Sequence, residues 1–311
     1  MTGADPRAAI SPTDHRVVAL VGILVALVVG LAAGWHVLRE RPLVDVPTLE
    51  PVNIGSAQEL AERLDSYDYN WPPRRAVPAI EIKAFPPDLD SLSVPRRKSV
   101  FFRSLLPLVL HQNAVIRDRR QRLRGIFPTN EPPAPGTAAA AFLERMRERY
   151  RVTGDLAEPN VRARLLRRVD AVPPALALAQ AATESGWGTS RFTREGNNLF
   201  GEWTWNADEG MIPQQRAEGA THRVRIFPDL QASVRAYTRN LNTGDAYREF
   251  RRLRATRRQS AQAPTALELA GGLRRYSERG SAYVREIRSM IRHNGLDALP
   301  QLTLRRGDNR R

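Results

Sequence analysis

The longest apolar run of the chain lies near its amino terminus. Residues 17–38 contain no Asp, Glu, Lys or Arg. At about 1.5 Å of helix rise per residue, they can cross a hydrocarbon core about 30 Å thick. We therefore expect a transmembrane anchor that follows a short tail, residues 1–16. A cleaved signal peptide is the alternative interpretation, although this apolar run is longer than the usual signal core.

A proline-rich segment and a helical segment follow the anchor. Residues 39–97 are rich in proline and show no sustained helical or strand period, so they predict an extended linker. From Ser99 the apolar positions recur at helical spacing, and Pro107 is expected to bend that helix. Residues 98–136 are thus predicted to form a helical accessory segment that ends in a second linker.

The main domain is predicted between residues 137 and 297, where the periodic signals are densest. Apolar spacing there predicts helices at about 138–151, 159–170 and 173–184. The alternating run from His222 to Phe227 predicts a strand of a small hairpin lobe, and Asp229 is a suitable cap for the helix after it. Residues 298–311 are expected to be a basic tail. The pattern thus predicts a mostly helical domain with a small β lobe.

The composition shows a strong positive charge and argues against metal, phosphate-loop and serine-nucleophile sites. The net charge is +15 at pH 7 and is carried almost wholly by arginine, a pattern that attracts nucleic acid, anionic lipid or acidic wall polymers alike. The chain has no cysteine and its histidines are scattered, so no metal site is predicted. Neither a phosphate-binding glycine loop nor a serine nucleophile elbow occurs, and we expect no cofactor.

Glu184 stands at the carboxyl end of the predicted apolar helix, just before Ser185 and Gly186. A carboxylate in apolar surroundings is destabilised when it is ionised, so its pKa should rise toward the value that a general acid needs near neutral pH. Cleavage of a glycosidic bond requires such an acid. The alternative is a glutamate that caps the helix or pairs with one of the many arginines.

Aromatic and amide side chains follow Glu184 within a short stretch. The candidates for sugar binding are Trp187, Asn198, Phe200, Trp203 and Trp205. Aromatic rings can stack on sugar faces, while amides can bind hydroxyl or acetamido groups. The alternative is a core for the small lobe, which we favour for Phe200 and leave open for Trp203 and Trp205.

Two motifs around these residues carry a family resemblance. Residues 181–190 (AATESGWGTS) and 197–201 (NNLFG) resemble the signature of bacterial peptidoglycan glucosaminidases of glycoside hydrolase family 73, and in particular its Bax-type members. Further stretches support the resemblance, namely 97–123, 234–243 and 276–283. It therefore extends over roughly residues 97 to 295.

The resemblance implies a lysozyme-like α+β domain, mostly helical, with a groove between the helical body and a small β lobe. It also implies cleavage of the glycan strand after N-acetylglucosamine, with Glu184 in the position of the family's general acid. A tyrosine near the family's site maps onto Tyr276, with Tyr283 as the second match. The substrate partner would be the glycan strands of peptidoglycan.

The second carboxylate is where this sequence departs from the family pattern, because the β lobe is short and its usual motif is absent. Glu209 and Glu218 are the preferred candidates, and Glu202 is a further one. Each could instead be an exposed, solvated glutamate. If none acts, the substrate's own 2-acetamido oxygen could attack the anomeric carbon, so the stereochemical course stays open.

The location of peptidoglycan implies a single-pass protein of the bacterial inner membrane, with residues 1–16 in the cytoplasm and the catalytic domain in the periplasm. The partners are then the membrane and the cell-wall glycan. A lytic transglycosylase and a noncatalytic glycan-binding protein are the alternatives. A nucleic-acid partner is not expected, because the runs 251–252 and 257–258 are typical of solvated helix faces.

Overall fold

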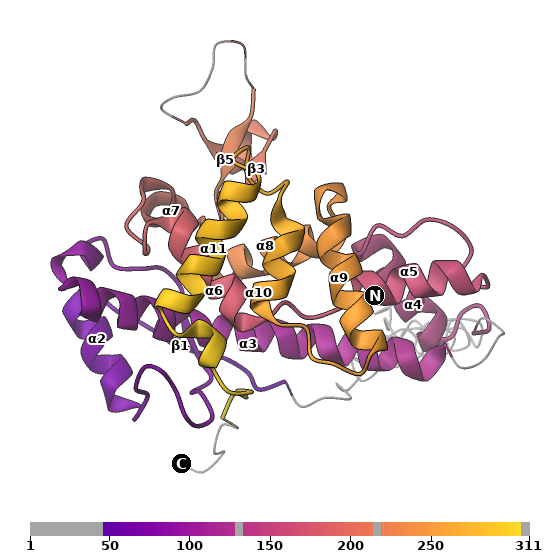
Figure 1. The fold of residues 1–311 in the computed structure, drawn as a ribbon, viewed down its shortest axis with the longest axis horizontal. Coiled ribbons are helices and arrows are strands. Elements are labelled where there is room, and N and C mark those ends of the chain that lie inside the picture. Colours follow the sequence, from indigo (N-terminus) through magenta and orange to yellow (C-terminus); the bar gives the residue numbers. More distant parts are fainter. Residues whose placement is uncertain (1–45, 128–132, 214–218, 220, 306–311) are drawn as a thin grey trace, which may run out of the picture. The chain divides into compact units, whose positions relative to one another are not determined.

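The structure is a computed structural model that describes residues 46–127, 133–213, 219 and 221–305. The predicted anchor, residues 17–38, lies outside the described residues. The described part is α+β and mostly helical, with a small antiparallel sheet (Figure 1), as the sequence predicted.

The strands are β1 (Glu50–Val52), β2 (Ile80–Ile82), β3 (Trp203–Thr204), β4 (Gly210–Met211) and β5 (Arg223–Arg225). The helices are α2 (Ala57–Ser66), α3 (Val94–Ile126), α4 (Ala138–Arg149), α5 (Pro159–Arg168), α6 (Pro174–Ser185), α7 (Arg191–Gly196), α8 (Leu230–Thr243), α9 (Arg248–Gln259), α10 (Ala266–Leu269) and α11 (Ser281–His293). Short 3-10 helices span Leu89–Ser91, Ala207–Glu209, Asp245–Tyr247, Ala270–Leu273 and Leu296–Ala298.

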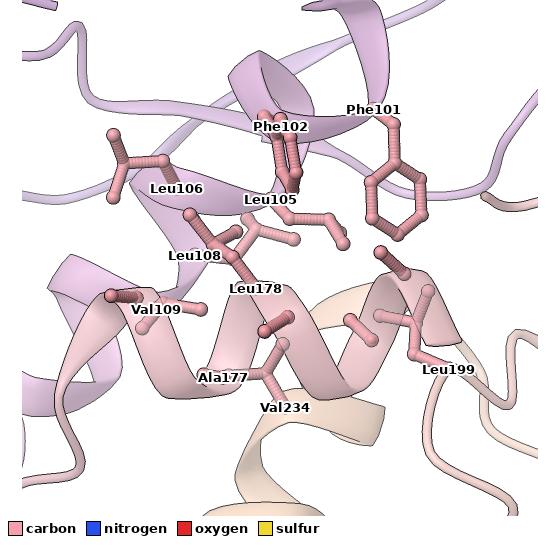
Figure 2. Packing of buried hydrophobic residues seen from close by; sticks show 14 of the residues in the cluster. Phe101, Phe102, Leu105, Leu106, Leu108, Val109, Ala177, Leu178, Leu199 and Val234 are labelled. Carbon is pink, nitrogen blue, oxygen red and sulfur yellow. The ribbon is translucent and has the colours of Figure 1, made fainter. Parts of the chain in front are cut away.

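The core is built around α6, which lies between α3 and α8. Alanines alternate with Leu176 and Leu178 along α6, and nearly all of these side chains are fully buried. Figure 2 shows Phe102, Leu105 and Val109 of α3 on one side of α6, with Val234 of α8 on the other. Small side chains let neighbouring helices approach closely, so this core holds α6 rigidly up to its carboxyl end.

Helix α3 is long and apolar enough to cross a membrane by length and composition alone. However, 78% of its most apolar window is buried inside the protein, which identifies it as a core helix of this domain. Pro107 lies inside α3 without ending it. The sequence predicted an accessory segment from residue 98, but α3 begins at Val94 and supplies a large part of the main core.

The predicted linker over residues 39–97 is partly wrong, because its described residues fold onto the core. Strands β1 and β2 pair in parallel, and α2 buries Leu60 and Leu64 completely. Ser56 caps α2 by accepting a hydrogen bond from the Glu59 backbone. The strands are only three residues long, but α2 does carry a helical period that the linker prediction missed, since its buried residues Ala57, Leu60, Ala61 and Leu64 stand at positions i, i+3, i+4 and i+7.

The described end of the chain also packs on this region instead of extending as a free tail. Leu304 forms a parallel bridge with Val77. The Arg305 guanidinium donates hydrogen bonds to the carbonyl oxygens of Ala76, Tyr67 and Asp68 at 3.0, 2.9 and 3.2 Å. The predicted basic tail is therefore ordered up to Arg305.

A buried charge network ties α9 to the segment before α6. Arg254 is 1% exposed, and its guanidinium donates to the carbonyl oxygens of Asp170 and Ala171, both at 3.0 Å, and to Asn242 Oδ1 at 2.7 Å. The Asp170 carboxylate, also buried, accepts hydrogen bonds from Arg258 and lies 3.7 Å from Arg254 Nε. Burial lowers the pKa of Arg254 to about 10, with Asp170 opposing that shift.

The small sheet forms the predicted β lobe, in the strand order β3-β5-β4 (Figure 1). Trp203 pairs with Val224, and Met211 pairs with the same residue from the other side. Asp229 caps α8 immediately after the lobe by accepting a hydrogen bond from the Ala232 backbone at 2.5 Å. This arrangement places the lobe beside the carboxyl end of α6.

Candidate active site

Glu184 occupies the last turn of α6, where Gly186 ends the helix in a left-handed conformation (φ 57°). Its carboxylate is half-buried and accepts a hydrogen bond from the Tyr283 hydroxyl. Burial raises the pKa of Glu184, while the Tyr283 hydrogen bond and the charge of Arg279 oppose that rise in pKa. A carboxyl group with this balance holds its proton at a higher pH than a solvated glutamate does.

The Glu184 carboxylate is oriented by a chain of buried hydrogen bonds. The Tyr237 hydroxyl donates to Gln180 Oε1 at 2.7 Å, and Gln180 Nε2 donates to the Tyr283 hydroxyl at 2.9 Å. Tyr283 then donates to Glu184. Gln180, Tyr237 and Tyr283 are all 0% exposed, so α6, α8 and α11 hold the carboxylate jointly. The sequence did not identify Gln180 or Tyr237, although a glutamine within an apolar helix was a usable signal.

The two candidate tyrosines lie side by side but make different contacts. The rings of Tyr276 and Tyr283 stack at 5.2 Å with an interplanar angle of 4°. The Tyr276 hydroxyl donates to the Phe200 carbonyl oxygen at 2.9 Å, whereas Tyr283 bonds Glu184. Burial raises the pKa of both hydroxyls, so both act as neutral donors.

A second carboxylate, Glu202, approaches this group from the β lobe. Its neighbour Gly201 has φ 67°, and a β-carbon built there would lie 3.8 Å from Glu184 Oε2. Glu202 Oε1 accepts a hydrogen bond from Asn240 Nδ2 at 2.9 Å. Burial raises the pKa of Glu202, and Asn240 and Arg225 oppose that rise. After burial, the charges of Glu184 and Glu202 both raise the pKa of Tyr237, Tyr247 and Tyr276, so the two carboxyl groups lie near the same tyrosines.

Of the two glutamates that the sequence preferred as the second carboxylate, Glu209 alone lies within the described residues. Glu209 is about half exposed and forms an ion pair with Arg225, with 3.3 Å between Oε2 and the guanidinium. Glu218 lies outside the described residues. Between the two described candidates, the contacts favour Glu202, which the sequence named without preferring it, over Glu209.

A cleft of about 730 Å³ runs between the β lobe and α8. The residues that bear on binding and charge in its lining are Glu202, Trp203, Trp205, Asn240, Tyr247, Tyr276 and five arginines. Trp203 and Trp205 are 55% and 72% exposed, and Trp203 stacks on His222 at 4.3 Å. Large exposed indoles at the edge of a cleft offer flat apolar surfaces to a ligand.

Phe200 also lines this cleft but is almost fully buried, and its ring stacks on Tyr237 at 3.9 Å. Asn198 is 2% exposed. Its side-chain Nδ2 donates to the Glu202 carbonyl oxygen, and its Oδ1 accepts a hydrogen bond from the Glu202 backbone N–H. Its position is thus that of a residue that supports the loop carrying Glu202.

Trp187 lies on the other side of the turn after Glu184. Its ring makes edge contacts with Phe101 and Phe102 at 5.8 and 5.2 Å, and the Lys98 ammonium lies 4.7 Å from its centroid. This position suits a packing role that fixes the end of α6. Within the described residues, no group of three or more His, Asp or Glu side chains could hold a metal ion.

Comparison with known proteins identifies the family of the chain. Residues 162–296 match the family model Glucosaminidase, described as mannosyl-glycoprotein endo-beta-N-acetylglucosaminidase. The chain belongs to this glucosaminidase family, which implies glycoside hydrolase activity on a glycan. Among its relatives is Protein bax of Escherichia coli (strain K12), 34% identical over 202 residues that cover 64% of this chain and 70% of that protein. No solved structure gave a significant match. The family resemblance drawn from the sequence is thereby confirmed.

Proposed function

We propose that this protein is a peptidoglycan hydrolase that cleaves the glycan strand after N-acetylglucosamine, with Glu184 as the general acid. The observation that carries the proposal is a half-buried carboxyl group of raised pKa, held by Tyr283 at the end of α6 and close to Gly201 of the loop that carries Glu202, in a glucosaminidase domain. A lysozyme-like arrangement, with the glycan between the helical body and the β lobe, is consistent with the cleft along Trp203 and Trp205.

The proposed chemistry assigns one step to each carboxyl group. Glu184 gives its proton to the glycosidic oxygen as the bond to the anomeric carbon breaks, and Glu202 takes a proton from the water that attacks this carbon. Asn240 keeps Glu202 pointed into the cleft, and Asn198 holds its backbone. Tyr283 and Gln180 keep Glu184 in one orientation.

We also propose that residues 17–38 anchor the protein in the inner membrane with the domain on the periplasmic side. Only residues 39–49 separate this apolar run from β1, and a chain of that length spans at most roughly 40 Å. The domain would then work close to the membrane surface. Protease added to intact spheroplasts should degrade the domain, whereas protection of the domain would contradict this orientation.

Product analysis tests the proposed reaction. The full chain, in mild detergent, is incubated with purified peptidoglycan, and the fragments are analysed by mass spectrometry. We expect free reducing N-acetylglucosamine ends. Products that carry 1,6-anhydro sugars would instead identify a lytic transglycosylase, and wall binding with no soluble fragments would identify a noncatalytic glycan-binding protein.

Removing the Tyr283 hydroxyl should shift the pH dependence of the reaction. A general acid must be protonated, so activity falls as pH rises through the pKa of Glu184. The Tyr283 hydrogen bond stabilises the ionised carboxylate and lowers this pKa. Tyr283→Phe should therefore move the alkaline limb of the pH–rate profile to higher pH, as measured by release of reducing ends.

Tyr276→Phe is the matched control, because the Tyr276 hydroxyl bonds the Phe200 carbonyl oxygen and not Glu184. Its alkaline limb should stay at the wild-type pH. A limb that moves to lower pH in Tyr283→Phe would show that this hydroxyl does not stabilise the carboxylate.

A further inference from the structure

The charged residues that line the cleft are mostly of one sign. Glu202 is the carboxylate among them, and the arginines are Arg149, Arg151, Arg225, Arg235 and Arg239. They come from the end of α4, from β5 and from one face of α8. The cleft next to the proposed catalytic groups is therefore strongly positive.

Several of these arginines have no close acidic partner in the part of the chain that the structure describes. Arg225 pairs with Glu209 at 3.3 Å, and Arg235 approaches Asp229 only to 3.9 Å. For Arg149 and Arg239, no ion pair with an acidic side chain exists among the described residues. Arg235 and Arg239 also stand four residues apart on α8, a spacing at which like charges destabilise a helix. This positive charge is thus not explained by the folded chain's own ion pairs.

The arginines that line the cleft repel one another and their neighbours electrostatically. Burial lowers the pKa of Arg149, and the positive charges of Arg119, Arg239 and Arg235 lower it further. Across on α3, burial and then the charge of Arg235 lower the pKa of His111. Such mutual repulsion is relieved when an anion binds between the guanidinium groups.

We propose that Arg149, Arg235 and Arg239 form a subsite for carboxylates carried by peptide stems on the glycan. This inference rests on the proposed function, because it takes the bound polymer to be peptidoglycan. Since one cleft contains both Glu202 and these arginines, a strand bound for cleavage has its acidic substituents within the same cavity. The preferred substrate is then peptide-bearing, acidic glycan, and strands stripped of peptides bind more weakly.

The arginine runs 251–252 and 257–258 are occupied and do not extend this surface toward nucleic acid. Arg251 donates to the carbonyl oxygens of Leu241 and Gly244. Arg252 pairs with Glu249, Arg257 with Glu268 and Arg258 with Asp170. These two runs therefore add no free positive surface to the cleft, which favours small anionic groups on a bound glycan over a long phosphate backbone.

Binding measurements with three soluble glycan preparations test the subsite. Full-length Glu184→Gln protein in detergent is titrated with peptide-bearing strands, with the same strands after amidation of their carboxylates, and with strands freed of peptides. We expect the native strands to bind at least about tenfold more tightly than the stripped strands, the effect of one charge-assisted hydrogen bond. Amidated strands should bind like stripped ones.

Adding Arg149→Gln and Arg239→Gln should bring the ratio of affinities for native and stripped strands close to one. Arg285→Gln with Arg292→Gln is the matched control, because both are exposed on α11 and neither lines the cleft. Equal binding of native and amidated strands, an unchanged ratio in the Arg149 and Arg239 variant, or tighter binding of a DNA duplex at equal ionic strength overturns the subsite.

The wild-type chain is assayed separately for hydrolysis of the same preparations. A carboxylate-dependent affinity without any hydrolysis would overturn the proposed enzymatic function while supporting the subsite. Hydrolysis without a carboxylate-dependent affinity would overturn the subsite while supporting the proposed enzymatic function.

Discussion

Replacing Glu184 with glutamine is expected to lower kcat on purified peptidoglycan by at least about 100-fold, the lower end of what a general acid contributes. Glutamine keeps the size of the side chain and can still accept the Tyr283 hydrogen bond, but it has no proton to give to the departing sugar oxygen. Affinity for the glycan should remain. Release of reducing ends at more than a few per cent of the wild-type rate would contradict the assignment of Glu184.

Two further glutamate variants separate the roles of the acidic groups. Glu202→Gln should also lose most of its activity, whereas Glu209→Gln should stay near wild type because Glu209 is half exposed and paired with Arg225. A fully active Glu202→Gln enzyme would exclude Glu202 as the base. Attack by the substrate's 2-acetamido oxygen would then account for the reaction.

Glu184→Gln should also raise the Tm of the protein. Measuring this Tm shows at the same time that the variant is folded. A group whose pKa is higher in the folded state contributes stability at low pH that is lost as pH rises through its folded pKa. Since the pKa of Glu184 is raised, the gain in Tm from the substitution should be larger at pH 8 than at pH 4. An equal Tm difference at both pH values would contradict the burial of this charge.

Replacing Asp170 with asparagine is expected to cost about 3–5 kcal/mol of unfolding free energy, the usual effect of leaving one partner of a buried ion pair uncompensated. Arg254 is 1% exposed and would lose the neutralising carboxylate while its backbone and Asn242 contacts remain. Chemical denaturation at neutral pH measures the difference. Asp245→Asn is the matched control, because Asp245 and its partner Arg248 are both 74% exposed, and it should barely change stability.

The pH dependence of this loss has the opposite sign to that of Glu184. Burial by itself would raise the pKa of Asp170, but Arg254, Arg120 and Arg258 lower it below 3.8. A lowered folded pKa contributes stability above the unfolded pKa that is lost as pH falls through the folded pKa. The wild type and Asp170→Asn should therefore differ fully near neutral pH and converge under acid conditions. A stability gap that does not shrink at all as pH falls through the acid range would contradict the network.

Local signals were enough to place the elements that carry the site. The apolar spacing of α6, its left-handed stop at Gly186 and the Asp229 cap of α8 act within about one helical turn, and the structure has these elements where the sequence predicted them. By contrast, the proline content of residues 39–97 suggested a linker. The contacts that fold α2 and β1 onto α3 lie too far along the chain for a local pattern to reveal.

The amino-acid sequence by itself determined the family, the mostly helical class and the position of Glu184 at the end of an apolar helix, because motifs and helix signals are read within a few residues. Only the tertiary structure decided what surrounds that carboxyl group. Gln180 and Tyr283 are 103 residues apart, and Glu202 and Asn240 are 38 apart. Such pairs meet because α6 packs against α8 and α11, and long-range packing, not local periodicity, sets the burial that raises the pKa of Glu184.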